Sequence, residues 1–174
     1  MTALEIEIAV MKYFNPRQNI IVPNVSWGLY NKEYKSLHEC DLIVLSGANW
    51  ATEVEIKISK SDLLKDAEKP HGHNHNLIRR LYFAVPESLM DIAMQNIPER
   101  SGLIVIKQKT RIKYKKDKYG GYLKDGDMQY LIAEVVRESK INVSAVKWTD
   151  AQRYQLARLG TMRILGLKEK LCKA

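Results

Sequence analysis

The stretch HECDLIVLSGANWATEVEIKIS, residues 38–59, decides the fold. It holds two runs of aliphatic and β-branched residues, 38–45 and 50–58, on either side of the short segment 46–49, which contains glycine and asparagine. Two such runs around a short polar segment are typical of a β-hairpin. The sequence therefore predicts two adjacent antiparallel strands here.

Charged side chains lie on one face of this predicted hairpin. Because side chains alternate along a strand, Glu53, Glu55 and Lys57 share a face. Counting outward from a turn centred near Ala48 places Asp41 opposite Glu55. Facing residues have Cβ atoms roughly 4.5–5.5 Å apart, and like charges there are destabilising. A divalent cation would remove this repulsion, and ligation by oxygen alone suits Mg²⁺, with Mn²⁺ as a substitute.

A third carboxylate comes from an amphipathic helix expected over residues 2–14. On a helical wheel with Leu4 at 0°, Glu7 lies near 300°, among the apolar residues, whereas Glu5 lies near 100°, on the polar side. A glutamate directed into a core needs a charge partner there. We therefore expect Glu7, and not Glu5, to join the site, the alternative being a structural glutamate.

These residues resemble the PD-(D/E)xK restriction-endonuclease-like superfamily, and more narrowly the MmcB-type DNA-repair-associated nuclease-like proteins. The resemblance covers roughly residues 1–107. It rests on the helix with Glu7, on Asp41, and on Glu55-Ile56-Lys57 in the next strand. The further segments that carry it are EIKIS (55–59), the helix with Asp62 and Asp66, LYFAVP (81–86) and IPERSGLIV (97–105).

The resemblance implies a metal-dependent DNA endonuclease. Asp41, Glu55, the Ile56 carbonyl and Glu7 would hold Mg²⁺, which lowers the pKa of a bound water. Lys57 would orient or deprotonate that water, or stabilise the transition state. DNA repair, or phage- or restriction-type DNA processing, is the expected setting. The alternative is a non-catalytic nucleic-acid-binding or repair accessory protein that retains the fold.

The remaining chain predicts a mixed α/β fold of the restriction-endonuclease-like type: helix, three-stranded meander, helix, strand, helix, strand. Residues 1–115 are expected to form this core, and residues 116–174 a basic, mainly helical extension packed on it. The elements expected after the hairpin are a helix over 59–68, a strand over 77–85, a helix over 86–96, a strand over 102–107, a Lys-rich strand beyond it, and helices over 128–139 and 150–171.

The 174 residues carry a net charge of +8, distributed unevenly. Residues 1–100 have 11 basic and 13 acidic side chains, and residues 101–174 have 17 basic and 7 acidic ones. Such a basic segment fits a polyanion such as DNA, or a merely solvated surface. With only two cysteines, no apolar run long enough to span a membrane and no secretory signal, the sequence predicts a cytoplasmic protein. It leaves open whether the protein is a homodimer.

Two further groups of residues suggest contacts with nucleic acid. Lys107, Lys109, Arg111, Lys113 and Lys115 alternate along the Lys-rich strand, which predicts a basic face for phosphate contacts or an edge strand protected from aggregation. In the second group, His73 and His75 belong to a histidine-rich segment with three interpretations. It could line the substrate channel, bind zinc or be an ordinary polar loop.

Overall fold

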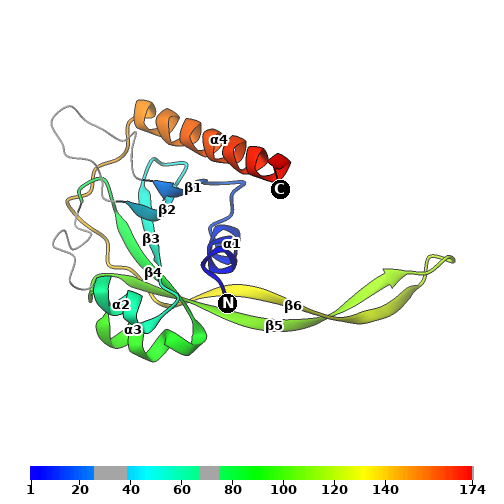
Figure 1. Ribbon diagram of the computed structural model, residues 1–174. Helices are drawn as coiled ribbons and strands as arrows, with labels where there is room; N and C mark the ends of the chain where they lie inside the picture. The colour runs from blue at the N-terminus through cyan, green and yellow to red at the C-terminus, as the bar shows by residue number, and fades with distance from the viewer. Residues whose placement is uncertain (26–38, 67–74, 174) are drawn as a thin grey trace.

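A six-stranded mixed sheet runs through the protein (Figure 1). The computed structural model describes residues 1–25, 39–66 and 75–173. The strands lie in chain order; β3, β4 and β5 are mutually parallel, and the other neighbours are antiparallel. Their bounds are β1 Ile20–Val25, β2 Cys40–Leu45, β3 Ala51–Ile56, β4 Arg80–Pro86, β5 Gly102–Lys116 and β6 Tyr122–Arg137. The predicted mixed α/β class is confirmed.

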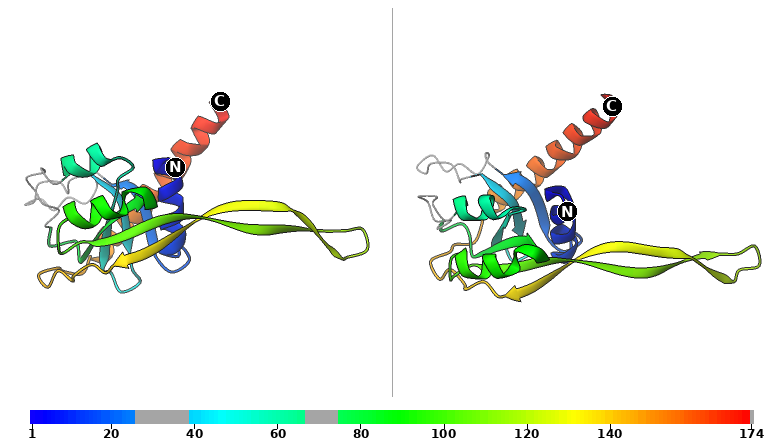
Figure 2. Two further views of the ribbon diagram at one scale, coloured as in Figure 1. Left: turned by 90° about the horizontal axis from the view of Figure 1, so that it is seen from below. Right: turned by 60° about the horizontal axis from the view of Figure 1, so that its bottom comes forward.

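Helices cover both faces of the sheet (Figures 1 and 2). The helix α1 packs on one face, where its apolar residues join those of β2 to β6 in one buried cluster. The helices α2 and α3 cover β4 and β5 on the other face, and α4 lies across β1. Their bounds are α1 Ala3–Tyr13, α2 Lys60–Asp66, the 3₁₀ turn η1 Glu87–Leu89, α3 Met90–Asn96 and α4 Asp150–Lys173.

The β2–β3 hairpin has the predicted register. Leu42 pairs with Val54 and Leu45 with Ala51, as expected from a turn centred near residue 48. Ser46 closes the turn, because its carbonyl accepts from the Asn49 amide and its own amide donates to the Trp50 carbonyl. Asn49 has a positive φ of 64°, which asparagine tolerates better than most residues.

The helix predicted over residues 128–139 was wrong, because residues 128–137 lie in β6. Met, Gln, Leu, Ala and Glu at 128–134 favour a helix locally, but the segment pairs with β5 along nearly its whole length. Leu131, Ala133 and Val135 point from β6 into the cluster beneath α1. Tertiary packing therefore overrides local propensity here. Residues 116–174 contain a 16-residue strand as well as a 24-residue helix.

The β5–β6 hairpin extends far beyond the rest of the sheet (Figure 2). We call residues 108–131 the arm. Most of its residues are exposed, and the expected boundary between residues 115 and 116 falls inside it. The predicted strand over 102–107 and the Lys-rich strand beyond it are one continuous strand, β5.

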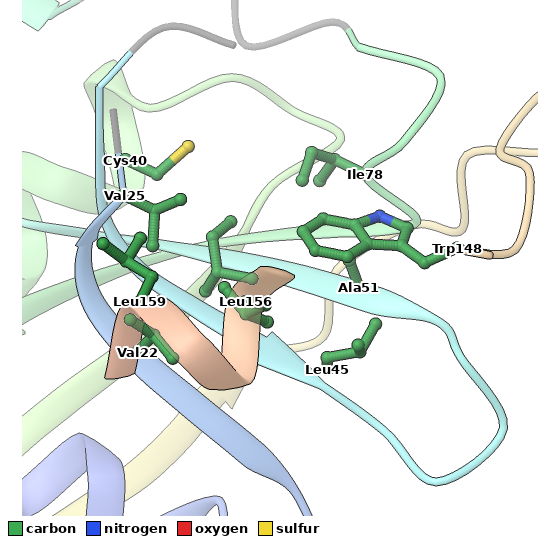
Figure 3. Packing of buried hydrophobic residues seen from close by; sticks show 10 residues of the cluster. Val22, Val25, Cys40, Leu45, Ala51, Ile78, Trp148, Leu156 and Leu159 are labelled. Atoms are coloured by element: carbon green, nitrogen blue, oxygen red, sulfur yellow. The ribbon is translucent and has the colours of Figure 1, made fainter. Parts of the chain in front are cut away.

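The C-terminal helix is attached through a buried tryptophan (Figure 3). Trp148 is 2% exposed, and its indole N–H donates to the Leu77 carbonyl at 2.8 Å. Leu156 and Leu159 of α4 pack in the same cluster, against β1 and β2. Thr149 and Gln152 form a capping box that starts α4, as the T-x-x-Q spacing indicates.

Candidate active site

An ion pair is buried at the carboxyl end of β3. Glu55 and Lys57 are 1% and 5% exposed, and the Lys57 amine donates to Glu55 Oε2 at 2.8 Å. The same amine lies 4.0 Å from Asp41 Oδ2. The structure thus brings together the three charges that the sequence predicts around this strand pair.

The Asp41 side chain accepts a backbone hydrogen bond where the pairing of β2 with β3 ends. The pairing of β2 with β3 ends at Leu42 and Val54, one residue short of Asp41 and Glu55. Beyond it, the Ile56 amide donates at 2.8 Å to Asp41 Oδ2 and not to a β2 carbonyl. The Asp41 carboxylate is therefore held in place by backbone while remaining partly open to solvent.

The site disfavours additional negative charge. Burial raises the pKa of Glu55, and the nearby Asp41 raises it further, while Lys57 acts in the opposite direction. Burial and the carboxylates of Glu53, Glu55 and Asp41 likewise raise the pKa of the Cys40 thiol, so this thiol stays protonated at neutral pH. Three carboxylates near one lysine create a potential that attracts cations.

Glu53 is a residue of this site that the sequence-based set of candidates missed. It is fully buried two residues before Glu55 on the same face of β3, and its carboxylate influences both Glu55 and Cys40. The alternation Glu53, Glu55, Lys57 was the signal that could have identified it.

Glu7 lies at the margin of the buried face of α1. The predicted centre of that face was wrong, because Ile6, Ala9 and Val10 are buried whereas Leu4 and Ile8 are exposed. The helix has apolar residues on two sides, and contact with the sheet selects the side that the helical wheel did not favour. Glu7 is half-buried, and burial followed by the charge of Asp41 raises its pKa.

Glu5 has a different task, as expected. Its carboxylate accepts from the Thr2 amide at 2.7 Å, and its own amide donates to the Thr2 hydroxyl. The bonds that the carboxylate accepts from the Thr2 amide and hydroxyl lower the pKa of Glu5, and together the two residues form a capping box at the start of α1.

The oxygen donors of the site are compatible with a magnesium ion whose coordination is completed by water and substrate. Among the described residues, no three His, Cys, Asp or Glu side chains gather closely enough to form a metal cluster. Mg²⁺, however, commonly binds through one or two carboxylates together with waters and substrate phosphates. Asp41, Glu55 and the Ile56 carbonyl could supply the oxygens from the protein, with Glu7 nearby.

The Lys-rich row of the arm is not the wholly basic face that was predicted. The Lys107 amine lies 3.0 Å from Glu134, and a bulge after Ile112 brings Lys113 and Lys115 within 2.9 and 3.3 Å of Asp125. The neighbours of Lys109 and Arg111 differ. The Arg111 guanidinium lies 5.4 Å from the centre of the Tyr130 ring, and neither residue forms an ion pair within the described parts of the chain.

This row shares a sheet face with the buried ion pair. Glu55 pairs with Phe83 of β4, and Phe83 pairs with Leu103 of β5. Because residues of the same parity on β5 share a face, Lys109 and Arg111 continue the face of Leu103 and Glu55 along the arm. The two groups therefore lie on the same side of the sheet, where α2 and α3 cover β4 and the base of β5.

The two histidine candidates have different outcomes. His73 lies outside the described residues. The His75 ring accepts at Nδ1 from the Leu77 amide, and its carbonyl accepts from the Ile78 amide and the Asn142 side chain. His75 therefore has a structural task in a turn, and its proposed contact with nucleic acid remains a prediction.

Comparison with known proteins adds information on the fold. The sequence matches no protein-family model and no curated protein. A solved structure of SPO1766, a protein of unknown function from Silicibacter pomeroyi, is similar with a TM-score of 0.57 and 17% identity, over 98% of this chain and 91% of that chain. At this identity the similarity shows a shared fold alone. Among the described helices, none is both long and apolar enough to cross a membrane.

Proposed function

We propose that this protein is a Mg²⁺-dependent DNA endonuclease that hydrolyses phosphodiester bonds. The observation that carries the proposal is the buried Lys57–Glu55 pair beside Asp41, at the end of β3. The PD-(D/E)xK resemblance of residues 1–107 supports it, and the expected cytoplasmic location is compatible with it. The basic arm supplies charge of the sign that DNA requires.

Each residue of the site has a task in this reaction. Asp41, Glu55 and the Ile56 carbonyl would hold the metal, with Glu7 directly or through water. When bound, the ion would supply a water of lowered pKa and would neutralise charge on the phosphate. Lys57 carries the positive charge that can orient an attacking water or stabilise charge on the phosphate oxygens. Its position against Glu55 fixes the amine before substrate arrives.

A cleavage assay tests the proposal. We expect the full-length protein to cleave plasmid, single-stranded or branched DNA with Mg²⁺ or Mn²⁺, and to stop when EDTA is added. Failure to cleave any of these substrates with either metal would refute it.

The second candidate function is a nucleic-acid-binding protein without catalysis. Two observations favour it: the lack of a three-ligand cluster in the described residues, and the engagement of Glu55 Oε2 by Lys57. DNA binding that is unchanged by Mg²⁺, without cleavage, would support this alternative.

Glu7→Gln is expected to reduce metal-dependent cleavage far more than Glu5→Gln. Only Glu7 is close enough to Asp41 for their charges to interact, whereas Glu5 is exposed and caps α1. Because the folded protein disfavours ionised Glu7, the substitution should not lower stability at pH 7. Cleavage rates and thermal unfolding of both variants check this, and equal activity in the two would contradict it.

Replacing Lys109 and Arg111 by glutamine is expected to weaken the salt dependence of duplex binding. Each phosphate contact contributes a log–log slope of about −0.9, so losing two should flatten the slope by roughly 1.8. Lys113→Gln with Lys115→Gln should change the slope less, because Asp125 already offsets these charges. Filter binding across a salt series measures both. An unchanged slope with new aggregation would instead indicate that the row protects an edge strand.

A further inference from the structure

The end of the arm is a well-formed two-stranded ribbon. We call residues 113–124 the arm tip. Asp117 Oδ1 accepts from the amides of Tyr119 and Gly121, both at 2.8 Å, and Gly120 adopts a φ of +86° in the same turn. The turn therefore has defined geometry, although it lies far from the core (Figure 2).

The arm tip combines exposed tyrosines with lysines. Tyr114, Tyr119 and Tyr122 are 57%, 84% and 68% exposed, so large aromatic surfaces face solvent. The amines of Lys116 and Lys118 lie 5.8 and 4.8 Å from the rings of Tyr122 and Tyr119. The arm tip has five lysines and one acidic residue, Asp117. Lys113 and Lys115 pair with Asp125, and Lys124 pairs with Asp127, whereas Lys116 and Lys118 form no ion pair among the described residues. This charge favours a polyanionic partner over a second copy of the same basic arm.

The dimensions of the arm tip fit a groove of duplex DNA. The major groove is about 12 Å wide and admits a two-stranded β-ribbon. Leu103 of β5 lies level with Glu55 across the sheet, and Tyr114 is eleven residues further along β5. At roughly 3.3 Å per residue, about 36 Å of strand separates Tyr114 from the level of Glu55. One turn of B-DNA is about 34–36 Å long. A duplex at Glu55 would thus present its groove again near the arm tip, where Tyr114 lies on the opposite ribbon face from Lys109 and Arg111.

We propose that the arm tip inserts into the major groove of duplex DNA, about one helical turn from the active site. Tyr114, Tyr119 and Tyr122 contact base edges there, and the lysines contact the flanking phosphates. Tyrosine suits this task because it offers a large contact area and a hydroxyl while losing little rotamer freedom. The inference rests on the proposed function for its DNA partner.

The test compares wild type with a triple variant, Tyr114→Ser, Tyr119→Ser and Tyr122→Ser. Binding to a 30-bp duplex is measured with EDTA across a salt series, together with dimethyl sulfate protection of guanine N7, which lies in the major groove. The triple variant should bind about tenfold more weakly, with an unchanged salt slope because tyrosine is neutral, and should lose the N7 protection. Tyr154→Ser, at an exposed tyrosine of α4, is the matched control.

Unchanged affinity and protection in the triple variant would overturn the inference. So would a change from dimer to monomer in sedimentation with DNA binding intact, because the tip would then bind a second copy. Tyr119→Ser alone, at the exposed turn, gives the same comparison if the triple variant folds poorly. This test measures binding and not cleavage. If the wild type protects guanine N7 but shows no activity in the separate cleavage assay, only the proposed endonuclease function is refuted.

Discussion

Asp41→Asn, Glu55→Gln and Lys57→Met are each expected to reduce Mg²⁺-dependent DNA cleavage by at least about a thousandfold. The loss follows because a metal and a positioned cation together contribute several kcal/mol to stabilising the transition state, at about 1.4 kcal/mol per factor of ten. Single-turnover cleavage of a labelled duplex measures the effect. The matched control is Asp91→Asn, at an exposed carboxylate of α3, which should retain the wild-type rate.

The three variants differ in how they affect stability. Asparagine at position 41 keeps an oxygen that can accept from the Ile56 amide, so Asp41→Asn should fold normally and gives the cleanest comparison. Glu55→Gln and Lys57→Met each remove one partner of a buried ion pair, which is destabilising because the remaining charge stays buried. Their assays therefore need circular dichroism on the same samples. Wild-type cleavage by Asp41→Asn would contradict the assignment of the site.

Trp148→Ala is expected to lower the free energy of unfolding by about 3–5 kcal/mol. The indole fills the cluster between α4 and the sheet, and its N–H satisfies the Leu77 carbonyl. For a chain of this length the midpoint of thermal unfolding should fall by about 6–20 °C. Differential scanning calorimetry measures the change.

Trp50→Ala provides the control for this substitution. Trp50 is half-buried, and Arg79 and Lys147 lie 3.9 and 5.7 Å from its ring. Since it fills no cavity in the core, its loss should cost far less than that of Trp148. Equal destabilisation by the two variants would contradict the role assigned to Trp148.

The local signals in the sequence predicted the hairpin and the starts of the helices near residues 2, 59 and 150 correctly. The register of β2 with β3 follows from the turn length, and Ser59 and Thr149 each accept a hydrogen bond near the start of their helices, as their spacing indicates. These features depend on residues within a few positions of one another. The juxtaposition of Asp41 with Lys57 could be predicted for the same reason, because one short turn connects their strands.

Other features depend on contacts that a single sequence does not reveal. Residues 128–137 form a strand because they hydrogen-bond to β5 and pack against α1, although their own propensities favour a helix. Lys113 and Lys115 meet Asp125 because of a bulge that alternation alone does not predict. The face of α1 that meets the sheet was likewise decided by packing.

The length of the arm affects the local unfolding of the β5–β6 hairpin in solution. From Arg111 and Met128 toward the turn, β5 and β6 pair only with each other among the described strands, and no helix contributes to a buried cluster there. Local opening of such a ribbon exposes little buried surface, so it costs less free energy than opening the core. Amide hydrogen exchange should therefore slow progressively from the turn toward Ile104 and Ile106, where the same two strands enter the core. One continuous hairpin thus has two stabilities, low at its outer end and close to that of the whole protein at its base.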